Sequence, residues 1–135
     1  MNTGFFKYLI IGALAMGLAS FFISGFGKTV ENAGYKHISM EEAADIMEKE
    51  SGYIILDVRT KEEYASGHIP GAIVVPNETI GASDIPELPD KNQMILVYCR
   101  SGNRSKQAAK KLADLGYTNI IEFGGIIDWT GSIEK

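Results

Sequence analysis

The distribution of apolar positions divides the chain into an N-terminal apolar run and a longer mixed region. The run from Tyr8 to Gly27 contains no charged side chain. A helix of that length would rise about 30 Å, roughly one hydrocarbon core. A signal peptide cleaved after Ala19 would leave an apolar tip on the mature protein. An uncleaved membrane anchor is therefore favoured, with cleavage as the alternative; a buried core helix fits less well because the run has no polar face.

The charges that flank this run predict its orientation. Lys7 and the α-amino group precede it, whereas Lys28 and Glu31 follow it. The positive-inside rule then places the N-terminus in the cytoplasm and the rest of the chain outside. We expect a cell-envelope protein, membrane-anchored with its domain on the non-cytoplasmic side, or secreted or periplasmic if the segment is cleaved. The predicted divisions are a signal peptide or anchor over 1–27, a linker over 28–34 and one folded domain over 35–135.

From residue 35 onward, short apolar runs alternate with segments of helical periodicity. This alternation predicts an α/β fold with a mostly parallel central sheet and helices on both faces. The Gly124-Gly125 pair is expected to break the last strand. Strands are expected over 36–38, 53–58, 72–75, 94–98 and 119–122. Helices are expected over 40–50, from the Thr60 cap to about residue 66 and over 105–115, with single turns in 77–93 and over 126–130.

Two of the predicted helices begin with the same capping pattern. Ser39 stands three residues before Glu42, and Thr60 stands three residues before Glu63. In such a capping box, each side chain bonds the other residue's backbone N–H at the start of the helix. At the other end of the 105–115 helix, Gly116 occupies the position after the cap that favours a left-handed residue.

Composition excludes several classes of function. The 135 residues carry a net charge of −4 and contain a single cysteine. A lone cysteine excludes an intramolecular disulfide framework and a multi-cysteine zinc site. The acidic balance argues against a nucleic-acid partner, since such proteins are normally basic.

The only cysteine, Cys99, falls at the end of an apolar strand and just before a helix. Ligands in open α/β sheets bind outside the carboxyl ends of the strands. The turn-forming residues 100–103 would let successive backbone N–H groups curl around one point, and the helix aims its positive N-terminus there. We therefore expect a reactive thiolate rather than the small buried hydrophobe that a single cysteine usually is.

Charge gathers around this cysteine. Residues 100–111 contain five basic side chains and no acidic one, so the rest of the chain carries eight basic against 17 acidic groups. Positive charge beside a thiol stabilises the thiolate and attracts an anionic substrate. The basic residues are Arg100, Arg104, Lys106, Lys110 and Lys111.

Three stretches together resemble the rhodanese-like domains. Residues 54–72 read Ile-Ile-Leu-Asp-Val-Arg-Thr-Lys-Glu-Glu-Tyr-Ala-Ser-Gly-His-Ile-Pro-Gly-Ala, similar to the family's Asp-Val-Arg…Gly-His-Ile-Pro-Gly-Ala signature. Residues 99–105 resemble its active loop, and Gly124-Gly125 with Trp129 resembles its C-terminal motif. The resemblance covers 35–135 and implies a parallel-centred α/β fold.

The resemblance implies a sulfurtransferase that works through a persulfide on Cys99 and needs no metal or organic cofactor. The sulfur would come from thiosulfate or a similar small anionic donor, and would pass to cyanide, a thiol or a sulfur-accepting protein. Arg100 and Arg104 would bind the donor, because guanidinium groups pair well with oxyanions. The full substrate-binding set is Arg100, Ser101, Gly102, Asn103 and Arg104. The supporting set is Asp57, Arg59 and Ser105, with a structural ion pair or capping role favoured for Asp57 and Arg59.

Other functions for the same loop remain as alternatives. A persulfide carrier or thiol-sensing module with low turnover would use Cys99 in the same way. Cysteine phosphatases, including those with this fold, place an arginine after five intervening residues, whereas Arg104 follows Cys99 after four and Ser105 holds the next position. A phosphatase or arsenate reductase is therefore less favoured. The presence of Cys99 and both arginines also disfavours an inactive binding module.

Overall fold

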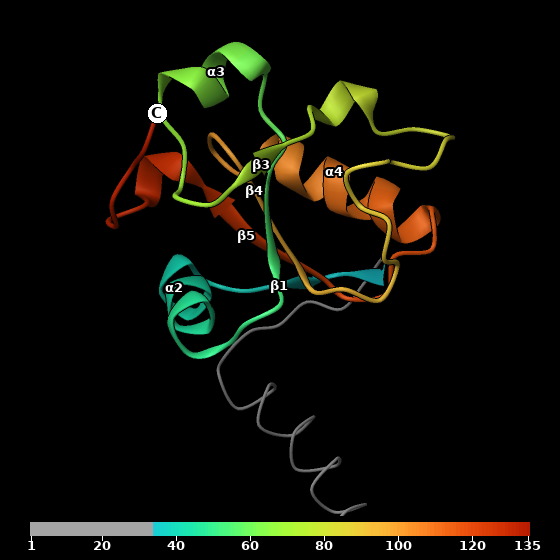
Figure 1. The fold of residues 1–135 in the computed structure, drawn as a ribbon, viewed down its shortest axis with the longest axis horizontal. Helices are drawn as coiled ribbons and strands as arrows, with labels where there is room; N and C mark the ends of the chain where they lie inside the picture. Colours follow the sequence, from blue (N-terminus) through green and yellow to red (C-terminus); the bar gives the residue numbers. More distant parts are fainter. Residues whose placement is uncertain (1–33) are drawn as a thin grey trace, which may run out of the picture.

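The computed structural model describes residues 34–135, which form a five-stranded parallel sheet in the order β1-β5-β4-β2-β3 (Figure 1). All four pairings of neighbouring strands are parallel, which confirms the predicted α/β class. Strand β4 lies at the centre between β5 and β2, as expected for a continuous apolar run. The strands are β1 (Lys36–His37), β2 (Ile54–Asp57), β3 (Ile73–Val74), β4 (Ile95–Cys99) and β5 (Ile120–Gly125).

The helices begin where the capping patterns predicted. Ser39 and Glu42 form a complete capping box at the start of one helix, and Thr60 and Glu63 form another. Each box satisfies backbone N–H groups that the first helical turn leaves without an intrahelical partner. The helices are α2 (Met40–Lys49), α3 (Lys61–Ser66) and α4 (Asn103–Asp114), with single 3₁₀ turns η2 (Asn77–Thr79) and η3 (Ile126–Asp128).

Helices cover both faces of the sheet, as predicted. On one face, Ala108 and Leu112 of α4 pack against Leu56 and Val97. On the other face, α2 contributes Ala43 to a second cluster of buried side chains. Figure 1 shows α2 and α4 on opposite sides of the strands. Strand β4, buried along its whole length, is therefore held firmly between two cores.

Two predicted boundaries near Cys99 were wrong. The Gly124-Gly125 pair does not break the last strand, because β5 continues through Gly125. A register shift after Val97 brings Cys99 opposite Gly125, with Gly124 at a φ of 99°. Helix α4 begins at residue 103 rather than 105 because Gly102 turns the chain with a φ of 105°, a conformation that favours glycine.

The N-terminal predictions lie outside the described residues. These are the anchor or signal segment over 1–27 and nearly all of the 28–34 linker. Within residues 34–135, no helix has the length and apolar character that a membrane crossing requires.

Candidate active site

Cys99 lies at the carboxyl end of β4, between β2 and β5. Its side chain is buried, with 1% of the residue exposed. The backbone N–H of Gly102 donates to its Sγ atom over 3.0 Å. The loop therefore turns back within three residues, so that the backbone N–H of Gly102 faces the sulfur. Such a bond stabilises negative charge on the sulfur.

The loop folds this tightly because β5 presents a glycine to it. A Cβ atom on Gly125 would lie 2.1 Å from the carbonyl oxygen of Arg100. In the space that glycine leaves, the loop packs directly on β5, and the N–H of Ile127 donates to that same carbonyl over 3.2 Å. Gly125 thus serves close packing of the active loop, a role that sequence reasoning missed.

Ser105, predicted as a supporting residue, sits beside the thiol. Its Oγ atom lies 3.5 Å from Cys99 Sγ and 3.0 Å from the carbonyl oxygen of Gly102. The same hydroxyl donates to the carboxylate of Glu122, a residue of β5 with no exposed surface. Ser105 therefore connects the thiol to a buried acid.

Glu122 is a site residue that sequence reasoning missed. Its Oε2 atom accepts from Ser105 and from the backbone N–H of Gly124 over 2.8 Å, while Oε1 contacts Nδ1 of His37 on β1. An acidic residue within the apolar run of residues 120–123 was the available signal, because burying a carboxylate is costly without partners.

Arg104, predicted to bind the donor, forms a two-pronged ion pair with Glu63 of α3. Its NH1 and NH2 groups donate to the two carboxylate oxygens over 2.8 and 3.0 Å. These bonds are the main reason that the pKa of Glu63 falls to about 2. Glu63 also caps α3 through the N–H of Thr60, so one carboxylate orders both the helix and the arginine.

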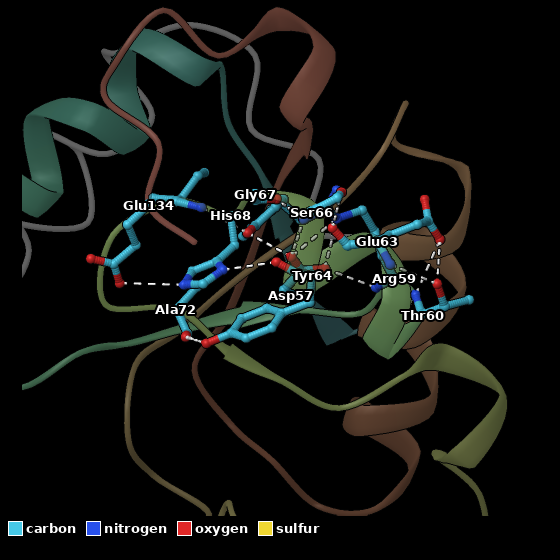
Figure 2. A network of polar contacts seen from close by, with 12 residues as sticks. Asp57, Arg59, Thr60, Glu63, Tyr64, Ser66, Gly67, His68, Ala72 and Glu134 are labelled. Atoms are coloured by element: carbon cyan, nitrogen blue, oxygen red, sulfur yellow. Dashed lines mark hydrogen bonds and ion pairs between the residues drawn. The ribbon is translucent and has the colours of Figure 1, made fainter.

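Asp57 and Arg59 form a buried ion pair next to the strand that carries Cys99. Arg59 donates to Oδ2 of Asp57 over 2.7 Å, and to the carbonyl oxygen of Gly67 over 2.7 Å. The hydroxyl of Tyr98, the residue before Cys99, donates to the same Asp57 oxygen over 2.7 Å. Figure 2 shows this network continuing through His68, which contacts Glu134. The pair thus braces β4 and the turn after α3.

The remaining loop side chains face solvent. Arg100, Ser101 and Asn103 are all exposed. Arg100 is exposed and Arg104 is half-buried, so both guanidinium groups can be reached from solvent. No group of three metal-ligating side chains occurs within residues 34–135. Chemically, the arrangement is a buried thiol with a backbone donor on its sulfur and guanidinium groups nearby, which suits attack on a small anion.

Comparison with known proteins agrees with this geometry. Residues 39–132 match the family model described as "Rhodanese-like domain". "Thiosulfate sulfurtransferase PspE" from Escherichia coli is 38% identical over 73 residues, which cover 54% of this chain and 70% of that protein. "Putative sulfur carrier protein YrkF" from Bacillus subtilis is 34% identical over 132 residues, covering 95% of this chain and 69% of that protein.

Other relatives and solved structures are similar over the same region. Three longer relatives, each named as an adenylyltransferase and sulfurtransferase, are matched over 21% to 24% of their length. A solved structure described as "rhodanese with anions from E. coli" has 35% sequence identity and a TM-score of 0.56. The match covers 62% of this chain and 98% of that one.

Proposed function

The chain belongs to the rhodanese-like family, and we propose that it is a thiosulfate-type sulfurtransferase that works through a persulfide on Cys99. The observation that carries the proposal is the bond from the Gly102 N–H to Sγ of Cys99, 3.0 Å long, at the base of a short loop. Such a donor stabilises the sulfur anion in the thiolate and, once the loop adjusts, in the persulfide.

The reaction divides into two displacements on sulfur. In the first, the Cys99 thiolate attacks the outer sulfur of thiosulfate, and the sulfur–sulfur bond of thiosulfate breaks with its electron pair leaving on sulfite. In the second, cyanide or an acceptor thiolate attacks the outer sulfur of the persulfide, and Cys99 leaves as a thiolate. Because one half-reaction finishes before the other begins, the kinetics are ping-pong.

Arg100 and Arg104 would hold the dianionic donor at the mouth of the loop. Arg100 is exposed there. The contacts to Glu63 use one N–H from each of two Arg104 nitrogens, out of the five N–H donors that a guanidinium group carries. The remaining donors would face the thiosulfate oxygens. The similar solved protein described as a rhodanese with anions supports anion binding in this fold.

The loop length supports sulfur rather than phosphate as the transferred group. Four residues separate Cys99 from Arg104, and α4 begins at residue 103, so the loop is short and tightly packed on Gly125. A phosphate oxyanion needs more N–H donors around it than a sulfur atom does. Phosphatase and arsenate reductase activities therefore remain the less favoured proposals.

Intact-mass measurement tests the proposal directly. The full chain is incubated with thiosulfate, desalted and weighed. We expect a gain of one sulfur atom, about 32 Da, on Cys99, and its loss as thiocyanate when cyanide is added. Cys99→Ser is the matched control and should gain nothing. If thiosulfate and other sulfane donors all leave the wild-type mass unchanged, the sulfurtransferase proposal is wrong.

A persulfide carrier with low turnover is the second candidate. The observation that favours it is the similarity over 95% of the chain to a protein named as a putative sulfur carrier. A carrier would gain the sulfur yet release it slowly to cyanide or small thiols. Rapid cyanide turnover would favour the enzyme, whereas a stable adduct would favour the carrier and a protein acceptor.

We also propose that the domain works in the cell envelope. The uncharged run from Tyr8 to Gly27 supports an anchor or an export signal. Membrane fractionation combined with the mass of the N-terminal peptide tests this. An intact N-terminus in the membrane fraction supports the anchor, a shortened chain in the soluble envelope fraction supports cleavage, and an intact chain in the cytoplasm contradicts both.

A further inference from the structure

A chain of hydrogen bonds leads from the buried thiol to the surface of the domain. Cys99, with 1% of its surface exposed, donates to Ser105 Oγ over 3.5 Å. Ser105 donates to Glu122 Oε2, and Oε1 of Glu122 contacts His37 Nδ1. The His37 side chain is 36% exposed. Residues from α4, β5 and β1 thus form one continuous polar path beside Cys99.

Burial makes this path relevant to the chemistry. Forming the attacking thiolate requires that the Cys99 proton leave a sulfur atom with almost no contact with water. Ser105 accepts from the thiol and donates to a carboxylate at the same time, which is the arrangement that moves a proton from one to the other. Glu122 is completely buried, and its bonded partners are a hydroxyl, an amide and an imidazole.

We propose that Ser105 and Glu122 form a proton relay for Cys99, with His37 holding the carboxylate in place. The thiol proton passes to Ser105 Oγ while the Ser105 hydroxyl proton passes to Oε2 of Glu122. The electron pair of the S–H bond stays on sulfur, so the products are a thiolate and a neutral carboxylic acid. The proton returns by the same path when the thiolate is released at the end of the cycle. This inference rests on the proposed role of Cys99 as nucleophile.

Other charged or titratable groups lie near the two ends of the relay, and their electrostatic effect is the same in the wild type and in the variants. Arg104 of α4 interacts electrostatically with the Cys99 position. Tyr35 lies just before β1, and burial, followed by the charge of Glu122, raises the pKa of its phenol. Tyr35 and Arg104 are unchanged in the variants below, so a change in Cys99 reactivity reports on Ser105 and Glu122.

Alkylation of Cys99 by iodoacetamide tests the relay without any sulfur donor. The rate is measured between pH 5 and 9 for the full-length wild type, Glu122→Gln and Ser105→Ala. A relay keeps Cys99 reactive at low pH, so both variants should alkylate about 100-fold more slowly at pH 6, the lower end of the range typical of general acid–base catalysis. Their profiles should meet the wild type at high pH, where hydroxide removes the proton.

The opposite result separates a relay from a static charge. If Glu122 acts only as a buried negative charge, Glu122→Gln should alkylate faster at pH 6, because removing that charge favours the thiolate. Faster alkylation, or an unchanged profile in both variants, would overturn the relay. If Glu122→Gln does not fold, Ser105→Ala alone decides, since it leaves the carboxylate in place and breaks the path.

Tyr117→Phe is the matched control for a lost buried hydroxyl. Tyr117 donates to the carbonyl oxygen of Leu88 over 2.6 Å within the same core cluster as Cys99. Its substitution should lower the melting temperature and leave the alkylation profile unchanged.

The two proposals can fail separately. If the alkylation profiles of Ser105→Ala and Glu122→Gln shift as expected but thiosulfate adds no sulfur, the relay is supported and the proposed substrate is wrong. If sulfur is added but both variants keep the wild-type alkylation profile, the relay is wrong and the proposed function is supported.

Discussion

Two buried polar networks lie on the strands that flank β4, one around Asp57 of β2 and one around Glu122 of β5. Both carboxylates have no exposed surface. Asp57 is held by the guanidinium group of Arg59 and the hydroxyl of Tyr98, so its charge is matched by an opposite charge within the fold. Glu122 is held by Ser105, an amide and His37.

The partners of the two carboxylates differ, and this difference assigns one network to stability of the fold and the other to the reactivity of Cys99. A buried carboxylate with a fixed guanidinium partner keeps its charge and braces the fold. A buried carboxylate bonded to a hydroxyl that also contacts a thiol has a route for gaining and losing a proton. The Asp57 network should therefore govern stability, and the Glu122 network should govern the reactivity of Cys99.

The largest effect that tests this comparison is expected at Asp57. Asp57→Asn leaves the Arg59 charge buried and unpaired, which should lower the free energy of unfolding by about 3–5 kcal/mol, measured by urea denaturation. The folded fraction should keep its Cys99 alkylation rate. Asp45→Asn, which breaks the exposed ion pair with Lys49, is the control and should leave the denaturation midpoint nearly unchanged. A loss of under about 1 kcal/mol at Asp57 would refute its bracing role.

A smaller effect, confined to reactivity, is expected at Gly125. In Gly125→Ala the added methyl group would collide with the Arg100 carbonyl, so the loop must move away from β5. A displacement of about 1 Å in reacting groups can cost about 100-fold in rate, and we expect a loss of that order in persulfide formation followed by mass spectrometry. Gly81→Ala, where nothing lies within 4 Å of the added atom, is the matched control. Equal rates in both variants would contradict the packing argument.

The smallest effect is expected where Glu63 joins the first network to Arg104 of the active loop. The pKa of Glu63 falls to about 2, so its contribution to stability is present above its ordinary pKa of 4.5. That contribution is lost as the pH falls toward 2, because the protonated acid no longer pairs with Arg104. The pair is partly exposed, which limits its value to about 1 kcal/mol or less.

Urea denaturation of the wild type and Glu63→Gln at several pH values measures this contribution. The stability difference between the two should be largest near pH 6 and should shrink steadily as the pH is lowered from 5 to 2.5. Glu62→Gln, an exposed neighbour in the same helix, provides the control. A difference that does not depend on pH would contradict this account, because the bonds from Arg104 and from the Thr60 N–H both favour the charged carboxylate.

Local sequence patterns predicted most of the elements but not all of their ends. The capping boxes at Ser39 and Thr60 placed two helix starts correctly because they depend on residues only three positions apart. The end of β5 was misjudged because Gly124 and Gly125 were interpreted from their intrinsic preference. Their conformation is set instead by the loop that packs on them, which comes from a distant part of the chain.

Residue order alone predicted the α/β class, the position of Cys99 at the end of a strand and the basic segment that follows it. Each of these depends on a pattern only a few positions long. The surroundings of the thiol, in contrast, emerge only when the chain is folded. Glu122 reaches Ser105, and Glu63 reaches Arg104, because the sheet order β5-β4-β2 sets strands side by side that are far apart along the chain. Contacts of this kind depend on strand order and register, which no local pattern of residues specifies.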